Sequence, residues 1–442
     1  QLYNVSKNSV KYFGVNSTVA GNRDGSGAVG ADSIAIGANA STNNVSAIAI
    51  GANASANNFS AIAIGTNATA ANTSAIALGE DANASGQFSM AQGKRASATG
   101  SGAIAMGTSA TADGNGATAL GILAQANGHQ ALSIGYNATA NGLLSIAHGG
   151  SSNANGTRSM AMGVAAQALG DNTIAIGVAA NATADYSIAQ GFYANATHQS
   201  AIAIGNLSTA SYDEAIAIGN GSTASNYSSI ALGVTSNASG QYSTAIGTLA
   251  NATGEASMAL GNASIATGKH AIAQGVYTNA SGANSIAIGG ASIASKIASV
   301  AIGSGANATG EYSIAHGATA IASGLASVAI GPNSMVTNNY SVTVGNNWLY
   351  GHHSGAFGST NVLSADNSYS VGSNNTFAAG QTDVLAFGNN ISTTASNSVF
   401  LGSNTQFTAR NNTTTLGSDS MASGSSNNVV GVISVGNNTA GQ

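Results

Sequence analysis

The sequence predicts an all-β fold, a parallel β-roll (solenoid) of 14-residue coils, and three observations predict it. Glycine recurs every 14 residues from Gly37 to Gly345, a series of twenty-three glycines without a slip. Alternating small and aliphatic residues precede each of these glycines, and a second small-residue segment follows it. Charged residues make up only 5% of the 442-residue chain. Without periodicity such a composition would indicate disorder, so the repeat is what predicts a fold.

The first strand of each coil has the form small-aliphatic-small-aliphatic-Gly. Residues 33–37 read SIAIG, residues 201–205 read AIAIG and residues 285–289 read SIAIG. Alternation with period two and enrichment in Ile and Val indicate a β-strand. The glycine that ends each strand marks a corner of the coil, and examples of these structural corners are Gly37, Gly177, Gly205 and Gly289.

A second strand follows each glycine. The position five residues after the glycine is Ala in 20 of 22 repeats, with Thr42 and Val336 as the exceptions. Two residues further on, Gly or Asn occupies 18 of 22 repeats, as at Gly86 and Asn58. Because Gly and Asn tolerate positive φ, we predict that the left-handed residue of a second corner lies there. Each repeat is therefore one coil of two strands and two corners, and successive coils stack as parallel strands.

The aliphatic side chains of the first strand can point outward or inward. Pointing inward, they would allow a monomeric roll. Pointing outward, they form an apolar ribbon too large for a monomer, which three identical chains around one axis would bury. Polar residues in the second aliphatic position favour the outward orientation, because a lone Gln or His inside a dry roll is costly. These residues are Gln92, His148, Gln190, Gln274 and His316. We therefore expect a homotrimer whose core includes Ile174, Ile176, Ile202, Ile204, Ile286 and Ile288.

The coil motif resembles the head repeat of YadA-like trimeric autotransporter adhesins, Asn-Ser-Val-Ala-Ile-Gly-x-x-Ser. Residues 284–292, NSIAIGGAS, match it with Ile in place of Val, and residues 326–334, ASVAIGPNS, are nearly as close. The opening residues 10–17, VKYFGVNS, and the late segment 397–402, NSVFLG, are similar to other parts of such heads. Residues 432–438, VISVGNN, resemble the start of a neck.

Four regions are expected along the chain. After Gly345 the glycine spacing loosens, and residues 346–353, which contain the only Trp, interrupt the register. That segment either caps the regular coils or marks a change in how the chains pack. We predict an opening or capping segment at 1–30, the regular head at 31–345, an irregular longer-coil continuation at 346–430 and the start of the neck at 431–442.

The resemblance implies a left-handed roll and a cell-surface adhesin head of a Gram-negative bacterium. It implies anchoring through an outer-membrane region absent from this chain, and attachment to host extracellular matrix of the collagen, fibronectin and laminin class or to other cells. Matrix binding would fall on the motif Asn284, Ser285, Ile286, Ala287, Ile288 and Gly289, although folding demands the same residues. The alternative is a structural spacer or fibre segment, of a cell appendage or a phage, without a ligand of its own. Ice binding fits less well, because the outward position four after each glycine varies from Ser41 to Ile293.

The residues that could take part in catalysis or bind a cofactor form no recognisable motif, so we predict neither an enzyme nor a cofactor. The sequence has no His-Glu-x-x-His motif, and Gly-rich matches carry no information in a chain with 59 glycines. Nine Lys and Arg residues form no basic patch for nucleic acid, and no apolar run reaches the ~18 residues of a membrane span. Three copies of His148 or His316 could converge on the trimer axis and bind a metal or an anion, or form a hydrogen-bonded or water-filled ring. The many Asn-x-Ser/Thr triplets are either sugar acceptors or the ordinary residues of corners.

Overall fold

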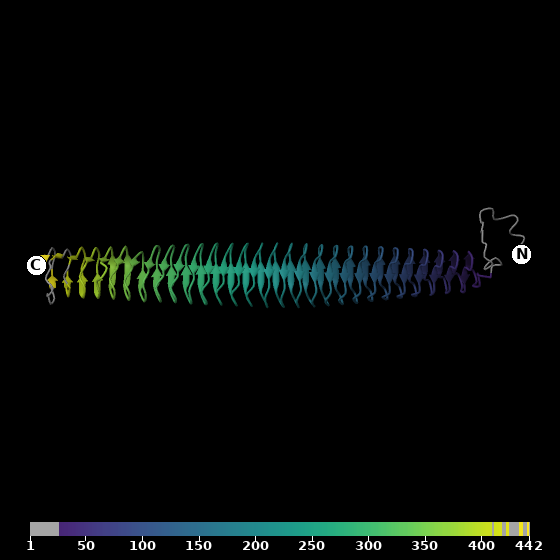
Figure 1. Ribbon diagram of the computed structural model, residues 1–442, viewed down its shortest axis with the longest axis horizontal. Coiled ribbons are helices and arrows are strands. Elements are labelled where there is room, and N and C mark those ends of the chain that lie inside the picture. Colours follow the sequence, from purple (N-terminus) through teal and green to yellow (C-terminus); the bar gives the residue numbers. More distant parts are fainter. Residues whose placement is uncertain (1–25, 409–410, 418–420, 424–432, 436–439, 442) are drawn as a thin grey trace. The chain divides into compact units, whose positions relative to one another are not determined.

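The computed structural model describes residues 26–408, 411–417, 421–423, 433–435 and 440–441. The chain divides into two compact units, Gln1–Ala215 and Ile216–Gln442. All regular elements of the described residues are β-strands, which pair in parallel with the equivalent strands of neighbouring coils (Figure 1). Within each unit, the odd-numbered strands form one sheet, here the strand-one sheet, and the even-numbered strands form another, the strand-two sheet. The predicted all-β parallel solenoid is confirmed.

In the first unit the two sheets keep one constant spacing. The strand-one sheet runs from β1 (Ile34–Ile36) to β25 (Ile202–Ile204), in three-residue strands that each begin 14 residues after the last. The strand-two sheet runs from β2 (Ser41–Thr42) to β26 (Thr209–Ala210) in two-residue strands with the same spacing. Each strand residue therefore lies beside its counterpart in the next coil, as Ile34 does beside Ile48.

The second unit begins with the same spacing. Its strand-one sheet keeps it from β27 (Ile216–Ile218) to β45 (Val342–Val344), and its strand-two sheet from β28 (Thr223–Ala224) to β44 (Met335–Val336). The later strands have irregular spacing: β46 (Trp348–Leu349), β47 (Gly355–Ser359), β48 (Val362–Leu363), β49 (Tyr369–Ser373), β50 (Thr376–Phe377), β51 (Val384–Phe387), β52 (Ser392–Thr393), β53 (Ser398–Leu401), β54 (Gln406–Thr408), β55 (Thr414–Leu416), β56 (Met421–Ser423), β57 (Ile433–Val435) and β58 (Ala440–Gly441).

Residues 346–353 stay within the ladder instead of capping it. Trp348 pairs with Met335, thirteen residues earlier, and with Val362, fourteen residues later. The coil is thus one residue short, and the strand-two sheet continues through it. Most of the predicted opening segment, residues 1–25, and most of the predicted neck lie outside the described residues. The four domain limits remain predictions.

The interior of each regular coil is filled by small side chains. In one coil of the first unit, Ala47 and Ala49 come from the strand-one side and Ala54 and Ala56 from the strand-two side, and all four are fully buried. The two isoleucines of β3 (Ile48–Ile50) flank Ala49 and remain half-buried on the outer face. Since successive strand residues point to opposite faces, the thin alanine interior sends the aliphatic residues outward. This is the orientation that the polar exceptions favoured.

The first corner requires glycine for two reasons. Gly51 has φ of 134°, a conformation that L side chains rarely adopt. A Cβ on Gly51 would also lie 2.5 Å from the carbonyl oxygen of Gly65 in the next coil. Asn53, two residues later, is left-handed with φ of 57° and completes the turn. Glycine therefore marks this corner because both the backbone conformation and the coil-to-coil distance exclude a side chain.

The second corner differs from its prediction. Its left-handed residue is not Gly86 but Phe88, with φ of 58°, and in an earlier coil not Asn58 but Ser60. Gly86 instead allows the backbone of the next coil to approach closely, because a Cβ there would lie 1.9 Å from the carbonyl oxygen of Gly100. Where Asn58 takes this position, its side-chain Oδ1 accepts a 2.8 Å hydrogen bond from the backbone N–H of Phe59.

Candidate functional site

The outer face of the strand-one sheet carries a column of aliphatic side chains, here the aliphatic ribbon. In the first unit, Ile174 and Ile176 of β21 (Ile174–Ile176) and Ile202 and Ile204 of β25 are half-buried on either side of a fully buried alanine. In the second unit, β37 (Ile286–Ile288) repeats the arrangement. Monomeric soluble proteins rarely expose a continuous apolar surface of this kind, so the ribbon is a candidate interface.

Single polar residues interrupt the ribbon. His148, in β17 (Ile146–His148), is exposed and lies between Ile134 and Met162 of the adjoining strands. His316, in β41 (Ile314–His316), is likewise exposed, between Ile302 and Ile330. Within the described part of the chain, no group of three or more His, Cys, Asp or Glu side chains could hold a metal ion. An ion ring at either histidine would need side chains from other copies, and it remains a prediction.

The outer face of the strand-two sheet has the opposite character. Asn181 in β22 (Asn181–Ala182) donates from Nδ2 to Oδ1 of Asn195 in β24 (Asn195–Ala196), at 3.0 Å. In the second unit Asn237 donates in the same way to Asn251, at 2.9 Å. Amide ladders of this kind repeat the backbone pairing at the side-chain level. In these stretches the coil has one apolar and one amide-lined polar outer face.

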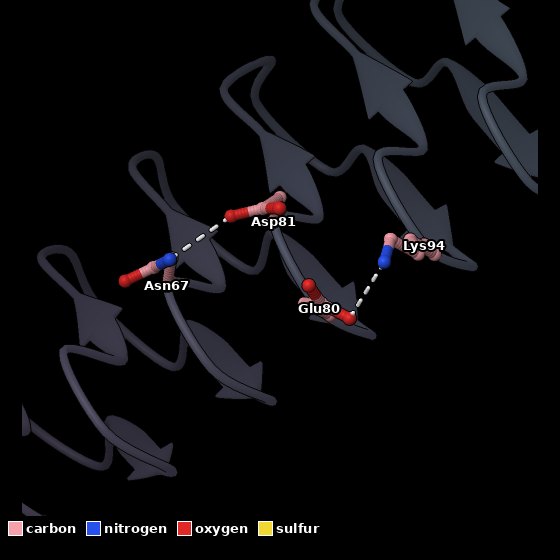
Figure 2. Close-up of polar contacts among 4 residues, drawn as sticks. All are labelled: Asn67, Glu80, Asp81 and Lys94. Carbon is pink, nitrogen blue, oxygen red and sulfur yellow. Dashed lines mark hydrogen bonds and ion pairs between the residues drawn. The ribbon is translucent and has the colours of Figure 1, made fainter.

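Polar ladders also run along the first corner, and Figure 2 shows one of them. Asn67 donates from Nδ2 to Oδ1 of Asp81, at 3.0 Å, one coil further on. Beside it, the ammonium group of Lys94 lies 3.0 Å from a carboxylate oxygen of Glu80. A similar exposed pair in the second unit, Lys269 with Glu255, lowers the pKa of the Glu255 carboxyl through a hydrogen bond to Lys269. Exposed pairs of this kind contribute little stability.

The motif 284–289 divides between folding and surface roles. Ser285 and Ala287 are fully buried, and a Cβ on Gly289 would lie 2.6 Å from the carbonyl oxygen of Gly303. The remaining corner glycines, Gly37, Gly177 and Gly205, also have positive φ, between 130° and 135°. Of the motif's side chains, Ile286 and Ile288 belong to the ribbon. Asn284, at a left-handed turn, lies 3.3 Å from the His270 ring nitrogen through its Oδ1.

Comparison with known families decides what these coils are. A family model described as the YadA head domain repeat matches overlapping two-repeat segments throughout residues 28–347: 28–54, 56–82, 70–96, 84–110, 98–124, 126–152, 140–166, 154–180, 168–194, 182–208, 196–222, 210–236, 224–250, 238–264, 266–292, 294–320 and 322–347. The chain belongs to the YadA head family. A comparison with curated proteins gives no match.

YadA heads are the surface-exposed parts of trimeric autotransporter adhesins of Gram-negative bacteria, and the family is not enzymatic. The described residues of this YadA head contain no helix long and apolar enough to cross a bilayer. His352 and His353, which adjoin in the sequence, make separate contacts. The His353 ring stacks on Tyr340, with centroids 5.2 Å apart, while the backbone N–H of His352 donates to Asp366.

Sequence reasoning missed a polar ladder inside the irregular part of this YadA head. Asn347, Asn361 and Asn375 are fully buried and hydrogen-bonded to one another or to backbone groups. The signal was available, because these asparagines recur every 14 residues where regular coils have Ala, Ser or Thr. It was hidden by the many exposed asparagines around them.

Proposed function

We propose that the chain is the head of a homotrimeric adhesin, which attaches a cell to extracellular matrix or to other cell surfaces. The aliphatic ribbon carries this proposal. In a threefold assembly, each interface joins one surface patch of a subunit to a different patch of its neighbour. Because the ribbon runs along every coil, it can supply both of these patches. Ile174, Ile202 and Ile286 would then be buried by the other two chains.

Attachment would come from many weak contacts. The coils repeat nearly the same exposed turns, and three chains multiply every such surface. For matrix proteins, the motif 284–289 can offer Asn284, because Ser285, Ala287 and Gly289 serve the coil interior and the corner. A matrix contact at this motif therefore has to involve the turn rather than the strand.

Solution mass and a binding screen test the proposal. Light scattering should give three times the 42.5 kDa of one chain, and a folded monomer at working concentration would contradict the assembly. The trimer should bind immobilised collagen, fibronectin, laminin or whole cells. A trimer inert toward all of them would favour the alternative, a spacer that holds other parts of a fibre away from the cell.

The two histidines of the ribbon add a second test. In the trimer, three His148 side chains would meet on the axis, where imidazoles can bind a metal or an anion. His148→Gln keeps a polar group at this position, as Gln190 does in a later coil. An ion ring predicts ordered density at the wild-type axis that this variant lacks. Well-separated imidazoles would exclude the ring and leave the trimer proposal intact.

A further inference from the structure

An open groove of about 470 Å³ lies in the first unit, over the polar face of the strand-two sheet. Asn181 and Asn195 belong to that sheet, and Ala179, Tyr193 and Leu207 are the left-handed turn residues of three successive coils. Ala179 has only a methyl group at the turn position where the next two coils have Tyr193 and Leu207, and this leaves space for the groove. The groove is within the size range of small-ligand sites.

The amide groups of the groove differ in what a ligand can reach. Asn181 donates from Nδ2 to Asn195, but its own Oδ1 is shielded from solvent and accepts from no donor among the described residues. The previous coil has Gln167 at the equivalent position, and its exposed side chain leaves the oxygen without a ladder partner. Oδ1 of Asn279, at the equivalent position in the second unit, is shielded and unpaired in the same way. A ligand cannot reach an oxygen that water does not reach, so the amide available to a ligand in this groove is that of the exposed Gln167.

The wall of the groove is aromatic. The Tyr193 side chain is 52% exposed, and its ring meets Phe192 edge to face, with centroids 4.4 Å apart and planes at 80°. Leu207, 56% exposed, extends the apolar wall. No charged residue lines the groove. An aromatic platform beside amide groups, without charge, matches a ligand that has one apolar face and several hydroxyl groups.

We propose that this groove binds a neutral pyranose, with a C–H face of the sugar against Tyr193 and hydroxyl groups hydrogen-bonded to the exposed amide of Gln167. The site lies on the polar face, so burial of the aliphatic ribbon in a trimer leaves it free. It is also separate from the motif 284–289, in the other unit. The site therefore gives the head a sugar-recognising function that does not depend on protein contacts with matrix.

The second unit contains a natural control. Tyr277 occupies the same turn position as Tyr193 and is 68% exposed, and Asn279 lies two residues after it. Its strand-two neighbours, however, are Ile265 and Ile293 in place of a second amide. An exposed tyrosine and an asparagine with a shielded, unpaired Oδ1 are thus common to both places. The flanking amides of Gln167 and Asn195 are what the groove has and the second unit's site lacks.

Saturation-transfer NMR on the full chain tests the proposal, with methyl β-D-galactopyranoside, methyl β-D-glucopyranoside and methyl α-D-mannopyranoside as probes. We expect transfer to ring protons of at least one probe. Tyr193→Ala should weaken it about fivefold, the size of one aromatic contact. Ala179→Tyr should abolish it by filling the groove, with a residue that the same turn already accepts in the next coil. Tyr277→Ala should leave it unchanged.

Two results would overturn the sugar site. One is a folded wild-type chain that gives no transfer to any of the three probes. The other is transfer that persists in both Tyr193→Ala and Ala179→Tyr, or that Tyr277→Ala removes equally. Circular dichroism of each variant establishes that the coils are intact. Because matrix binding is measured separately, failure here leaves the adhesin proposal standing, and the reverse also holds.

Discussion

Inside the second unit, the side-chain Nδ2 of Asn361 donates a 2.9 Å hydrogen bond to Oδ1 of Asn347, one coil earlier. The same Nδ2 reaches the carbonyl oxygen of Gly372, and Oδ1 of Asn361 accepts from the backbone N–H of Asn375. Regular coils have a small residue at this position, alanine as at Ala54 or serine as at Ser222. The irregular coils therefore bond buried backbone groups with amides where regular coils have an alanine or a hydroxyl, such as that of Ser222, which donates to the carbonyl oxygen of Gly219.

Replacing Asn361 by alanine should destabilise the second unit. The substitution installs a residue that many regular coils have, but it leaves the buried N–H of Asn375 without its acceptor and removes the Nδ2 donor from the carbonyl oxygen of Gly372. Oδ1 of Asn347 keeps the backbone N–H at position 361. Each unsatisfied buried group costs about 1–3 kcal/mol, so we expect a loss of about 3 kcal/mol. Denaturant unfolding gives the total, and hydrogen exchange should show lost protection around Asn375.

The matched control for that prediction is Asn374→Gly. Asn374 is exposed at a left-handed turn and donates to Asn390 along the surface, and glycine accepts the same φ. Because water can replace a surface partner, the expected change is below about 0.5 kcal/mol. Equal losses in the two variants would show that the interior position has no special role.

The regular fold could be predicted because one constraint is repeated in every coil. A glycine such as Gly51 is needed at each first corner, and the interior favours small residues such as Ala56, so the period is visible in the sequence. The second corner was predicted less well, because a glycine can be required either for a positive φ or for close contact with the next coil. At Gly86 it provides space for the next coil and not a positive φ, and sequence alone does not distinguish the two.

Gly177→Ala should be far more damaging than Gly102→Ala. At Gly177, φ is 131° and the new Cβ would lie 2.3 Å from the carbonyl oxygen of Gly191. At Gly102, φ is 66° and no atom lies within 4 Å of the new Cβ. We expect a cost of about 1 kcal/mol for Gly102→Ala, from the left-handed conformation alone, and about 3 kcal/mol or more for Gly177→Ala. Thermal melts of both variants measure the difference, and similar melting temperatures would contradict it.

The exposed ion pair of Figure 2 should contribute almost nothing. Lys94 and Glu80 are 48% and 52% exposed, so water and salt screen their attraction. Lys94→Ala should change the unfolding free energy by less than about 0.5 kcal/mol. A larger loss that disappears in high salt would instead indicate an electrostatic network along this corner.

The candidate sites were harder to predict than the fold. The ribbon followed from alternation in strands such as Ile174–Ile176, but the groove depends on three residues in two successive coils. Ala179 must be small, Tyr193 must be aromatic and Asn181 must begin an amide ladder, and no motif connects these requirements. Their relationship becomes visible only when the 14-residue register places them side by side.

Ile174→Asp should dissociate the proposed trimer without unfolding the coils. Ile174 points away from the alanine interior and is half-buried in the single chain, so a carboxylate there can remain in water. In a trimer, the same carboxylate would be buried without a partner, at a cost of several kcal/mol per chain. Ile286→Asp should act in the same way in the second unit. Thr139→Asp, on the polar strand-two face, is the control and should stay assembled. Light scattering reports the mass and circular dichroism the strand content. Intact trimers of both isoleucine variants, as stable as the control, would show that the aliphatic ribbon is not where the chains meet.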